Sequence, residues 1–336
     1  MSNDAPDMAL LWNSFTGYQR TAVLKAAVEL DVFTQIAGGA TTVEALAQRC
    51  KAAPRGLRPL LNYLVADEFL TREGERYGLS ATAAAFLDRN SPAYLGAGVE
   101  FIASPMIVEG FTRLTDAVRR GGTADPDGGT LSPDHPVWVQ FARSMSGLAG
   151  MMATLLANQL DIEHSPAAKV LDVAAGHGMF GITLARLNPR VSVTALDWKN
   201  VLAVAEENAR AAGVMERFHT LAGSAFDVPF GSGYDLVLLP NFLHHFDPPT
   251  CERLLAKTHA ALAPGGRVVI VEFVPNDDRL GPPDAVRFGI VMLSSTPSGD
   301  AYTFAEYQKM LRNAGFPAAT LQDLLPSPAR LIVAKK

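Results

Sequence analysis

The sequence contains only two cysteines, Cys50 and Cys251, which stand far apart in helical patterns. This excludes a fold held together by disulfides and predicts reduced, buried thiols, as in a cytoplasmic protein. No apolar run reaches the roughly 18 residues that a membrane-spanning helix needs. The chain starts with the acidic stretch MSNDAPDMALLW, which lacks the basic beginning of a signal peptide. We therefore expect a soluble, cytoplasmic protein with no membrane partner.

An excess of basic residues is also missing. The chain has 29 Lys and Arg against 34 Asp and Glu, which gives a net charge of −5 at pH 7. Because binding to nucleic-acid phosphates requires clustered basic side chains, no nucleic-acid partner is expected. Apolar residues make up 48% of the 336 positions. That is enough for a sizeable core in a chain of two domains.

What the chain does contain is a glycine-rich turn between a strand pattern and a helix pattern. Residues 170–181 read VLDVAAGHGMFG, in which Gly176, Gly178 and Gly181 have the spacing G-x-G-x-x-G. Glycine permits positive φ and lets the backbone approach a ligand closely. The next apolar run ends in Asp197, where nucleotide-binding folds place a carboxylate that binds ribose hydroxyls. The pattern predicts a nucleoside cofactor but leaves its identity open.

Strand and helix patterns alternate from residue 169 onward, which predicts an α/β fold with a parallel sheet covered by helices. The last two apolar runs, 318–325 and 329–336, are separated only by PSP. So short a connection predicts an antiparallel hairpin, because a parallel return needs a crossover. The expected strands are 169–173, 191–196, 218–222, 234–240 and 267–273, and the expected helices between them are 179–188, 201–213 and 249–262.

The first part of the chain has a different pattern. Residues 10–100 predict three short helices followed by two strands at 69–80, which is typical of a winged helix. A DNA-binding, ligand-sensing regulator is one interpretation, but the helix that would read DNA offers only Arg55 and Arg58 among many leucines. The first helices are also more apolar than a solvated module tolerates. We therefore expect residues 1–100 to form a homodimerisation domain.

Residues 101–165 are expected to supply a linker and pocket helices ahead of a cofactor-binding domain over 166–336. The segment 121–136 is rich in Gly, Pro and Asp and predicts a loop, and 137–161 predict a long helix with three methionines. Such methionines either belong to the core or line a ligand pocket. Core packing is the default for any one apolar residue at helical spacing. The candidates for the substrate pocket are Phe141, Met145, Phe288 and Met292, and Trp138 fits either role.

Several features favour a cofactor other than NAD. The glycine turn lies in mid-chain after a helical domain, and NFLHHFD places two histidines after the fourth strand pattern, where open α/β sheets bind ligands. The second half also contains LDVAAGHGMFG (171–181), TALDW around Asp197, GSAFDVP (223–229), LHHFDPPTC (243–251) and PGGRVVIVE (264–272). In this combination the chain resembles the small-molecule O-methyltransferases that depend on S-adenosylmethionine, the family of caffeate and hydroxyneurosporene methyltransferases.

The resemblance implies a class I methyltransferase domain with a Rossmann-like sheet and a C-terminal antiparallel hairpin, preceded by a mainly α winged-helix dimerisation domain. It implies S-adenosyl-L-methionine as cofactor, with its methionine part at Gly176 and Gly178 and its ribose at Asp197. Trp198, Ala225 and Phe226 would then surround adenine. Ser224 stands where the family has an adenine-binding Asp, and Pro240 where plant members have Lys. Asp172 either binds the cofactor or holds the loop.

Methyl transfer to a hydroxyl requires alignment, exclusion of water and removal of the hydroxyl proton. A histidine suits the last task because its pKa lies near neutrality. The resemblance assigns the general base to His244 and the carboxylate that orients it to Glu272. It predicts O-methylation of a small-molecule acceptor, with an aromatic or polyketide-like metabolite as the expected class.

Two departures from the family leave an alternative open. His245 replaces a family Asp, and Ala301 replaces a family Glu. Adjacent histidines would suit metal-assisted C-methylation of an α-keto acid, since imidazoles are good metal ligands. The region 289–302, which should supply a distant ligand, has no histidine, so Asp247, Asp277, Asp278 or Asp284 would have to substitute, and no metal is expected. Because consecutive side chains rarely aim at one point, His245 is expected to face the cofactor loop or solvent, and it is also a candidate for substrate binding.

Overall fold

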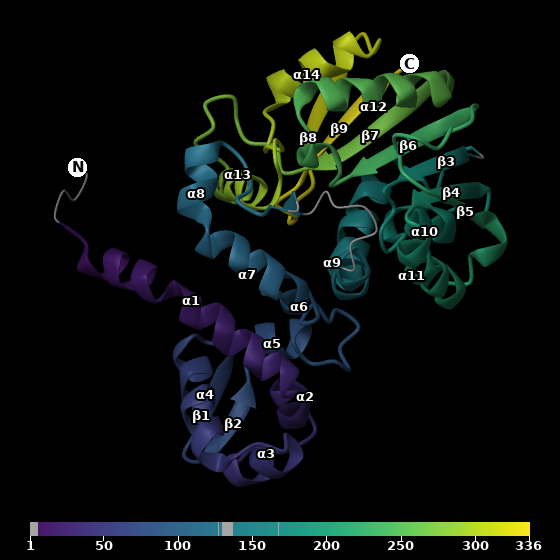
Figure 1. Cartoon of the computed structure of the whole chain (residues 1–336). Helices are drawn as coiled ribbons and strands as arrows, with labels where there is room; N and C mark the ends of the chain where they lie inside the picture. Colours follow the sequence, from purple (N-terminus) through teal and green to yellow (C-terminus); the bar gives the residue numbers. More distant parts are fainter. Residues whose placement is uncertain (1–5, 127, 130–136, 167) are drawn as a thin grey trace, which may run out of the picture. The chain divides into compact units, whose positions relative to one another are not determined.

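The computed structural model describes residues 6–126, 128–129, 137–166 and 168–336 (Figure 1). Part of the loop predicted over 121–136 lies outside these residues. The chain divides into two compact units, Met1–Ser104 and Pro105–Lys336. Residues 105–165, for which a linker and pocket helices are expected, lie within the second unit.

The first unit consists of short helices and a two-stranded antiparallel sheet. The first predicted helix is in fact two helices, because Asp31 has a left-handed backbone with φ 59° that ends the first one. The hydroxyl of Thr42 accepts the N–H of Ala45 at the start of the next helix. The elements are α1 (Met8–Glu29), α2 (Val32–Ala37), α3 (Val43–Arg49), α4 (Pro54–Ala66), β1 (Leu70–Glu73), β2 (Arg76–Leu79), α5 (Ala81–Phe86) and α6 (Gly98–Ile102).

The second unit is built on a seven-stranded sheet with the order β5-β4-β3-β6-β7-β9-β8. Strands β3 to β7, the first five of this sheet along the chain, pair in parallel, and β9 is antiparallel to both β7 and β8. The predicted α/β fold and C-terminal hairpin are therefore confirmed. The strands are β3 (Ala168–Val173), β4 (Val191–Asp197), β5 (Phe218–Ala222), β6 (Tyr234–Pro240), β7 (Leu262–Glu272), β8 (Ala319–Asp323) and β9 (Arg330–Lys335).

Helices cover both faces of this sheet (Figure 1). Strands β3, β6 and β7 are buried on both faces, which explains why they read as continuous apolar runs. One face packs against α9 (Val137–Gln159), α10 (Met179–Leu187) and α11 (Lys199–Ala211), and the other against α12 (Pro248–Ala261) and α14 (Phe304–Asn313). The second unit also contains α7 (Pro105–Thr112), α8 (Leu114–Arg120) and α13 (Pro283–Ser295), and the short turns η2 (Met215–Arg217) and η3 (Leu243–His245).

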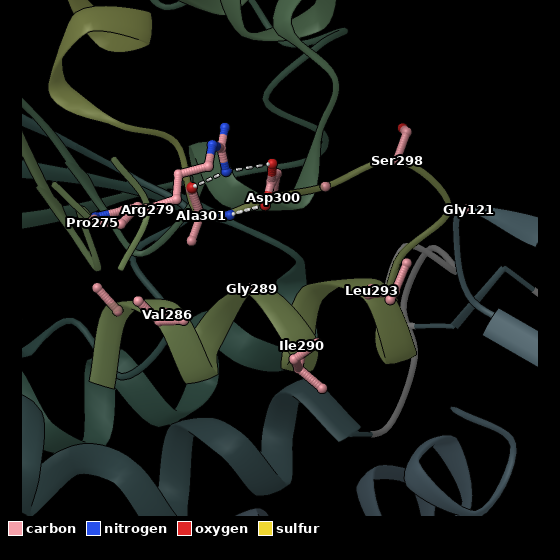
Figure 2. A pocket seen from close by; sticks show the side chains of 12 residues that line it. Gly121, Pro275, Arg279, Val286, Gly289, Ile290, Leu293, Ser298, Asp300 and Ala301 are labelled. Carbon is pink, nitrogen blue, oxygen red and sulfur yellow. Dashed lines mark hydrogen bonds and ion pairs between the residues drawn. The ribbon is translucent and has the colours of Figure 1, made fainter. Parts of the chain in front are cut away.

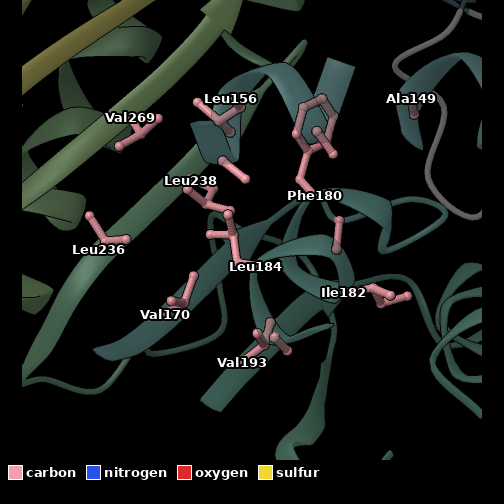
Figure 3. Packing of buried hydrophobic residues seen from close by; sticks show 14 of the residues in the cluster. Ala149, Leu156, Val170, Phe180, Ile182, Leu184, Val193, Leu236, Leu238 and Val269 are labelled. Carbon is pink, nitrogen blue, oxygen red and sulfur yellow. The ribbon is translucent and has the colours of Figure 1, made fainter. Parts of the chain in front are cut away.

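The core under α9 and α10 joins side chains from several strands of the sheet. Val170 of β3, Leu238 of β6 and Val269 of β7 lie in one buried cluster with Leu156 of α9 and Phe180 of α10 (Figure 3). This packing fixes the start of α10 against the end of β3, which is where the glycine turn lies. None of the helices in the described part of the chain is both long and apolar enough to span a membrane.

The strand order reverses around β3, because β4 and β5 lie on one side of it and β6 and β7 on the other. Open α/β sheets bind their ligands at the carboxyl ends of strands beside such a reversal. The glycine turn follows β3, and the two histidines follow β6. The sheet topology therefore brings both sequence features to the same edge.

Gly181 tests how closely α10 packs on the sheet. A Cβ on Gly181 would lie 2.6 Å from Cγ1 of Val193 on β4. We expect Gly181→Ala to lower the free energy of unfolding by about 1–3 kcal/mol through overpacking, measured by urea denaturation. The helical Gly56 has no neighbour within 4 Å of such a Cβ, so Gly56→Ala should leave stability unchanged or raise it. Adding Val193→Ala should recover much of the loss, and a fully stable Gly181→Ala protein would contradict the packing argument.

Candidate active site

The glycine turn after β3 adopts the backbone that its residue types permit. Gly176 and Gly178 have φ of 58° and 72°, in the left-handed region. A Cβ on Gly178 would lie 3.0 Å from Cβ of Ala205 and 3.1 Å from the ring of Phe218, so close packing also requires glycine there. Around Gly176 the nearest atom to such a Cβ is 3.7 Å away, on Phe141. The turn is thus packed tightly at Gly178, whereas a Cβ at Gly176 would make only ordinary van der Waals contacts.

Two carboxylates bracket this turn. Asp197, the last residue of β4, accepts hydrogen bonds from the N–H of Gly176 at 2.8 Å and of Trp198 at 2.7 Å. Burial raises the pKa of Asp197 to about 6, against the lowering effect of those two bonds. The fully buried Asp172 accepts one bond, from the N–H of Gly181 at 3.0 Å, and burial together with the charge of Asp197 raises its pKa to about 7. The Oδ1 atom of Asp172 is buried and has no hydrogen-bond partner.

The segment after β5 forms a small loop beside the turn. Ala225 is buried, whereas Phe226 is 42% exposed. The hydroxyl of Ser224 accepts the N–H of Phe226 at 3.1 Å, which leaves its own proton for another acceptor. Lys257 of α12 donates to the carbonyls of Ala225 and Phe226 at 2.8 and 3.0 Å. No sequence pattern marks this lysine, because an isolated Lys on an amphipathic helix looks like any solvated residue.

Beyond β6 the structure brings His244 and Glu272 together. Glu272 is the last residue of β7 and is fully buried, and its Oε2 lies 2.5 Å from Nδ1 of His244. Its Oε1 accepts the backbone N–H groups of Phe242 at 3.0 Å and His244 at 3.3 Å. The carboxylate therefore holds both the imidazole and the η3 turn that carries it. With Nδ1 engaged by the carboxylate, Nε2 is left as the basic nitrogen of His244.

The expectation that the two histidine side chains diverge is wrong. The ring centroids of His244 and His245 lie 4.3 Å apart, and the ring of His245 packs edge-on against Trp138 of α9 at 5.5 Å. Glu272 holds the ring of His244 and Trp138 packs on the ring of His245, and in these positions the two rings lie side by side. Burial and the neighbouring His244 hold the pKa of His245 well below its usual range, so His245 stays neutral. Its Nδ1 is buried without a hydrogen-bond partner.

The described residues place no group of three or more His, Cys, Asp or Glu where it could hold a metal ion. The acids that would have had to complete a site with the histidines make other contacts. Asp247 accepts the N–H of Thr250 at the start of α12, and Asp284 pairs with Arg287. Asp277 and Asp278 accept backbone N–H groups of Ala305 and Leu280.

Aromatic rings form a continuous wall from the glycine turn to the histidines. Phe141 stacks on His177 of the glycine turn and meets Trp138 edge-on. On the opposite side of His244, Phe288 of α13 meets the imidazole edge-on at 4.7 Å and stacks on Phe273. Two further candidates line up with these rings along their helices: Met145 is half-buried one turn after Phe141, and Met292 is buried one turn after Phe288.

A cavity of about 450 Å³ lies between α13 and the segment 298–301 (Figure 2). Val286, Ile290 and Leu293 form its apolar side, and Arg279, which pairs with Asp300, lies on the other. The segment 298–301 also backs the η3 turn, because a Cβ on Gly299 would lie 2.2 Å from the carbonyl oxygen of His244.

The chain matches a family model for the O-methyltransferase domain over residues 111–317 and a model for the O-methyltransferase dimerisation domain over residues 12–89. The chain belongs to the O-methyltransferase family. It is 35% identical to 3-hydroxy-5-methyl-1-naphthoate 3-O-methyltransferase of Streptomyces sahachiroi, over 91% of this chain and 88% of that protein. It is 31% identical to the tetracenomycin polyketide synthesis 8-O-methyl transferase TcmO of Streptomyces glaucescens, over 92% and 91%.

Solved structures agree with this family. A candidate O-methyltransferase from Nostoc punctiforme superposes with a TM-score of 0.93 at 52% identity, over 99% of this chain and 100% of that one. Human N-acetylserotonin methyltransferase in complex with S-adenosylmethionine has the same fold, with a TM-score of 0.85 at 23% identity and 99% coverage of both chains. Members of the O-methyltransferase family depend on S-adenosylmethionine, so membership of this family confirms the predicted family, enzyme class and cofactor.

The residues at the glycine turn fit this cofactor. Its ribose hydroxyls and its amino group are hydrogen-bond donors, and the turn offers two carboxylates with raised pKa values and the orphaned Oδ1 of Asp172. Such groups are costly to bury unless a ligand supplies donors.

The raised pKa values predict a pH-dependent affinity for the cofactor product S-adenosylhomocysteine. A donor prefers the charged carboxylate, so binding should weaken as the pH falls through about 7 and 6, by up to tenfold per unit for each proton taken up. The stability of the ligand-free protein should show the opposite trend with pH. Because the folded-state pKa values lie above the unfolded ones, these groups favour the folded state at low pH, and that contribution is lost as the pH rises to 7.

Calorimetry at pH 5.5 and 7.5, in buffers of different ionisation enthalpy, measures this effect and counts the protons released on binding. The thermal shift caused by S-adenosylhomocysteine should be larger at pH 7.5. Asp197→Asn should bind weakly and lose part of the pH dependence. Equal affinity at both pH values would contradict the assignment of these carboxylates to the ligand.

Proposed function

We propose that this O-methyltransferase methylates a hydroxyl group of an aromatic small molecule, with His244 as general base and Glu272 as its orienting carboxylate. The observation that carries the proposal is the buried contact between Glu272 and Nδ1 of His244, at the sheet edge that also holds the glycine turn. A neutral imidazole with one nitrogen fixed by a carboxylate is suited to take a proton on the other.

The reaction needs few groups from the protein. When bound, the cofactor supplies a methyl group on a positively charged sulfur, so the leaving group is already activated. Nε2 of His244 would take the hydroxyl proton, and the cofactor would supply the methyl group to the hydroxyl oxygen and keep the electron pair of the broken bond on its sulfur. The carboxylate of Glu272 stabilises the imidazolium that results. Alignment of oxygen and methyl carbon supplies most of the remaining rate enhancement.

The cofactor site of the proposal uses both sides of the glycine turn. The backbone of Gly176 and Gly178 binds the methionine part of the cofactor, and Asp197 binds its ribose hydroxyls. Asp172 holds the turn through Gly181, and its unpartnered Oδ1 is left for a donor group of the cofactor. The adenine side consists of Trp198, Ser224, Ala225 and Phe226, and Lys257 fixes the carbonyls of the last two.

An aromatic acceptor is favoured by the wall around His244. Phe288 contacts His244 directly, and Phe141 stacks on His177 of the glycine turn. A flat acceptor between these two rings would lie close to both the base and the cofactor. We also assign Met145, Met292 and His245 to this pocket, the last as a neutral hydrogen-bonding partner. Two relatives named for O-methylation of a naphthoate and of a tetracenomycin polyketide support the same class of acceptor.

His244→Ala should lower kcat by about 10² to 10⁴, the usual contribution of a general base. The affinity for S-adenosylhomocysteine should stay within twofold, because His244 does not touch the glycine turn. Mass-spectrometric assays with hydroxynaphthoates and naphthols, together with calorimetry, measure both quantities. The exposed His164, which pairs with Asp161, gives the control His164→Ala with unchanged kcat. Undiminished turnover of His244→Ala would disprove the assignment of the base.

The same proposal includes a homodimer formed through the first unit. Helix α1 exposes large apolar side chains, among them Trp12 at 64% and Phe15 at 63%. Such a surface is typical of a contact with another chain, and the match to a dimerisation domain covers this helix from residue 12. A cytoplasmic location stays part of the proposal, because Cys50 and Cys251 are both free thiols.

Light scattering of the wild-type protein should give twice the chain mass of 35.9 kDa. Phe15→Glu places a charge in the apolar surface and should yield a monomer that is still folded, since this side chain supports no core of its own unit. Asn13→Glu puts the same charge on an exposed polar position of α1 and should remain dimeric. A dimeric Phe15→Glu protein would place the interface elsewhere.

A further inference from the structure

The turn that carries His244 is held from two sides. Towards β7, Glu272 binds the imidazole and two backbone N–H groups of the turn. On the other side the turn presents carbonyl groups. Sγ of Cys251 donates to the carbonyl of Leu243 at 3.2 Å, and the hydroxyl of Tyr302 donates to the carbonyl of Phe246 at 2.6 Å. Phe246 is the residue directly after the η3 turn.

Tyr302 is itself firmly placed. Its side chain is buried, and its ring packs edge-on against Tyr307 at 5.9 Å. The residue before it is fixed by Arg279, which donates to the carbonyl of Ala301 at 3.3 Å and pairs with Asp300 and Glu306. The residue after it, Thr303, begins α14 through a reciprocal pair of hydrogen bonds with Glu306. The Tyr302 hydroxyl therefore reaches the turn from a rigid support.

The hydroxyl can act only as a donor to this carbonyl. Burial, and the negative charges of the groups around it, raise the pKa of Tyr302, so its proton stays in place. Without that proton the Phe246 carbonyl would lose a short hydrogen bond and keep at most the long contact of 3.7 Å with Sγ of Cys251. The segment 298–301 would still approach the His244 carbonyl closely at Gly299, but no hydrogen bond from Tyr302 would fix the end of the turn.

We propose that Tyr302 is a positioning residue for the general base: its hydrogen bond to the Phe246 carbonyl fixes the end of the turn that carries His244, opposite the point where Glu272 holds it. This inference rests on the proposed role of His244. Ala301 stands where the resemblance expects a carboxylate. In this chain the neighbouring Tyr302 supports the turn through its hydroxyl group. A displacement of the base by a fraction of an ångström is enough to slow proton transfer, because reactivity depends steeply on alignment.

Tyr302→Phe removes this hydroxyl and keeps the ring. We expect kcat for a naphthol that the wild-type enzyme methylates to fall about tenfold, with KM for the naphthol and the affinity for S-adenosylhomocysteine within twofold. The matched control is Tyr307→Phe, because Tyr307 is a buried neighbour whose hydroxyl has no hydrogen-bond partner. It should leave kcat unchanged. Equal kcat values for Tyr302→Phe and the wild type would overturn the inference.

A second measurement needs no methyl acceptor. The proton between Nδ1 of His244 and Glu272 should give a low-field NMR resonance, identified by its absence in His244→Gln. We expect this resonance to shift or broaden in Tyr302→Phe and to keep its position in Tyr307→Phe. A resonance that stays unchanged while Tyr302→Phe merely melts at a lower temperature shows a purely structural role and refutes the inference. If the wild-type enzyme methylates no hydroxyl, the proposed function fails, but this resonance still decides whether Tyr302 positions His244.

Discussion

The buried carboxylate of Glu272 is the interaction on which the rest of this site depends. A charge with no exposed surface is tolerated only when donors surround it, and here the imidazole of His244 and two backbone N–H groups meet this need. The carboxylate cannot leave those donors without stranding a charge in the core. It therefore fixes the chain after β6 to the end of β7. As a result, the pairing of these two strands determines the orientation of the His244 side chain.

The carboxylates on the cofactor side behave in the opposite way. Asp172 and Asp197 have raised pKa values, and one oxygen of Asp172 has no partner. The same sheet edge thus combines a carboxylate that the protein satisfies completely with two that it leaves for a ligand to complete. In the proposed function, the first gives a rigid base, and the others give an affinity for the cofactor that grows with their charge. A parallel sheet can provide both, because the ends of β3, β4, β6 and β7 lie next to each other.

The sequence predicts this architecture well where the physics is local or periodic. Strands buried on both faces must be apolar throughout, so β3, β6 and β7 were visible as runs, and the glycines were visible because only they fit the left-handed turn. The break at Asp31 was missed, since an apolar period continues across it. Contacts such as those of Lys257 and Tyr302 were missed for another reason. They join polar atoms far apart in the chain, and no spacing rule encodes which carbonyl a side chain will reach.

The two departures from the family pattern have a common electrostatic consequence. With His245 and Ala301 in place of acids, Glu272 is the one carboxylate that the described residues bring against the base, and burial keeps His245 neutral. Once His244 has taken a proton, the His244–Glu272 pair is neutral as a whole. In the proposed reaction, the negative charge on the acceptor oxygen and the positive charge on the cofactor sulfur would also cancel. Further acids would add uncompensated charge to a buried, aromatic-walled site, where the cost of charge is highest. What this site needs from additional residues is alignment rather than charge, and hydroxyl and ring contacts such as those of Tyr302 and Trp138 can supply it.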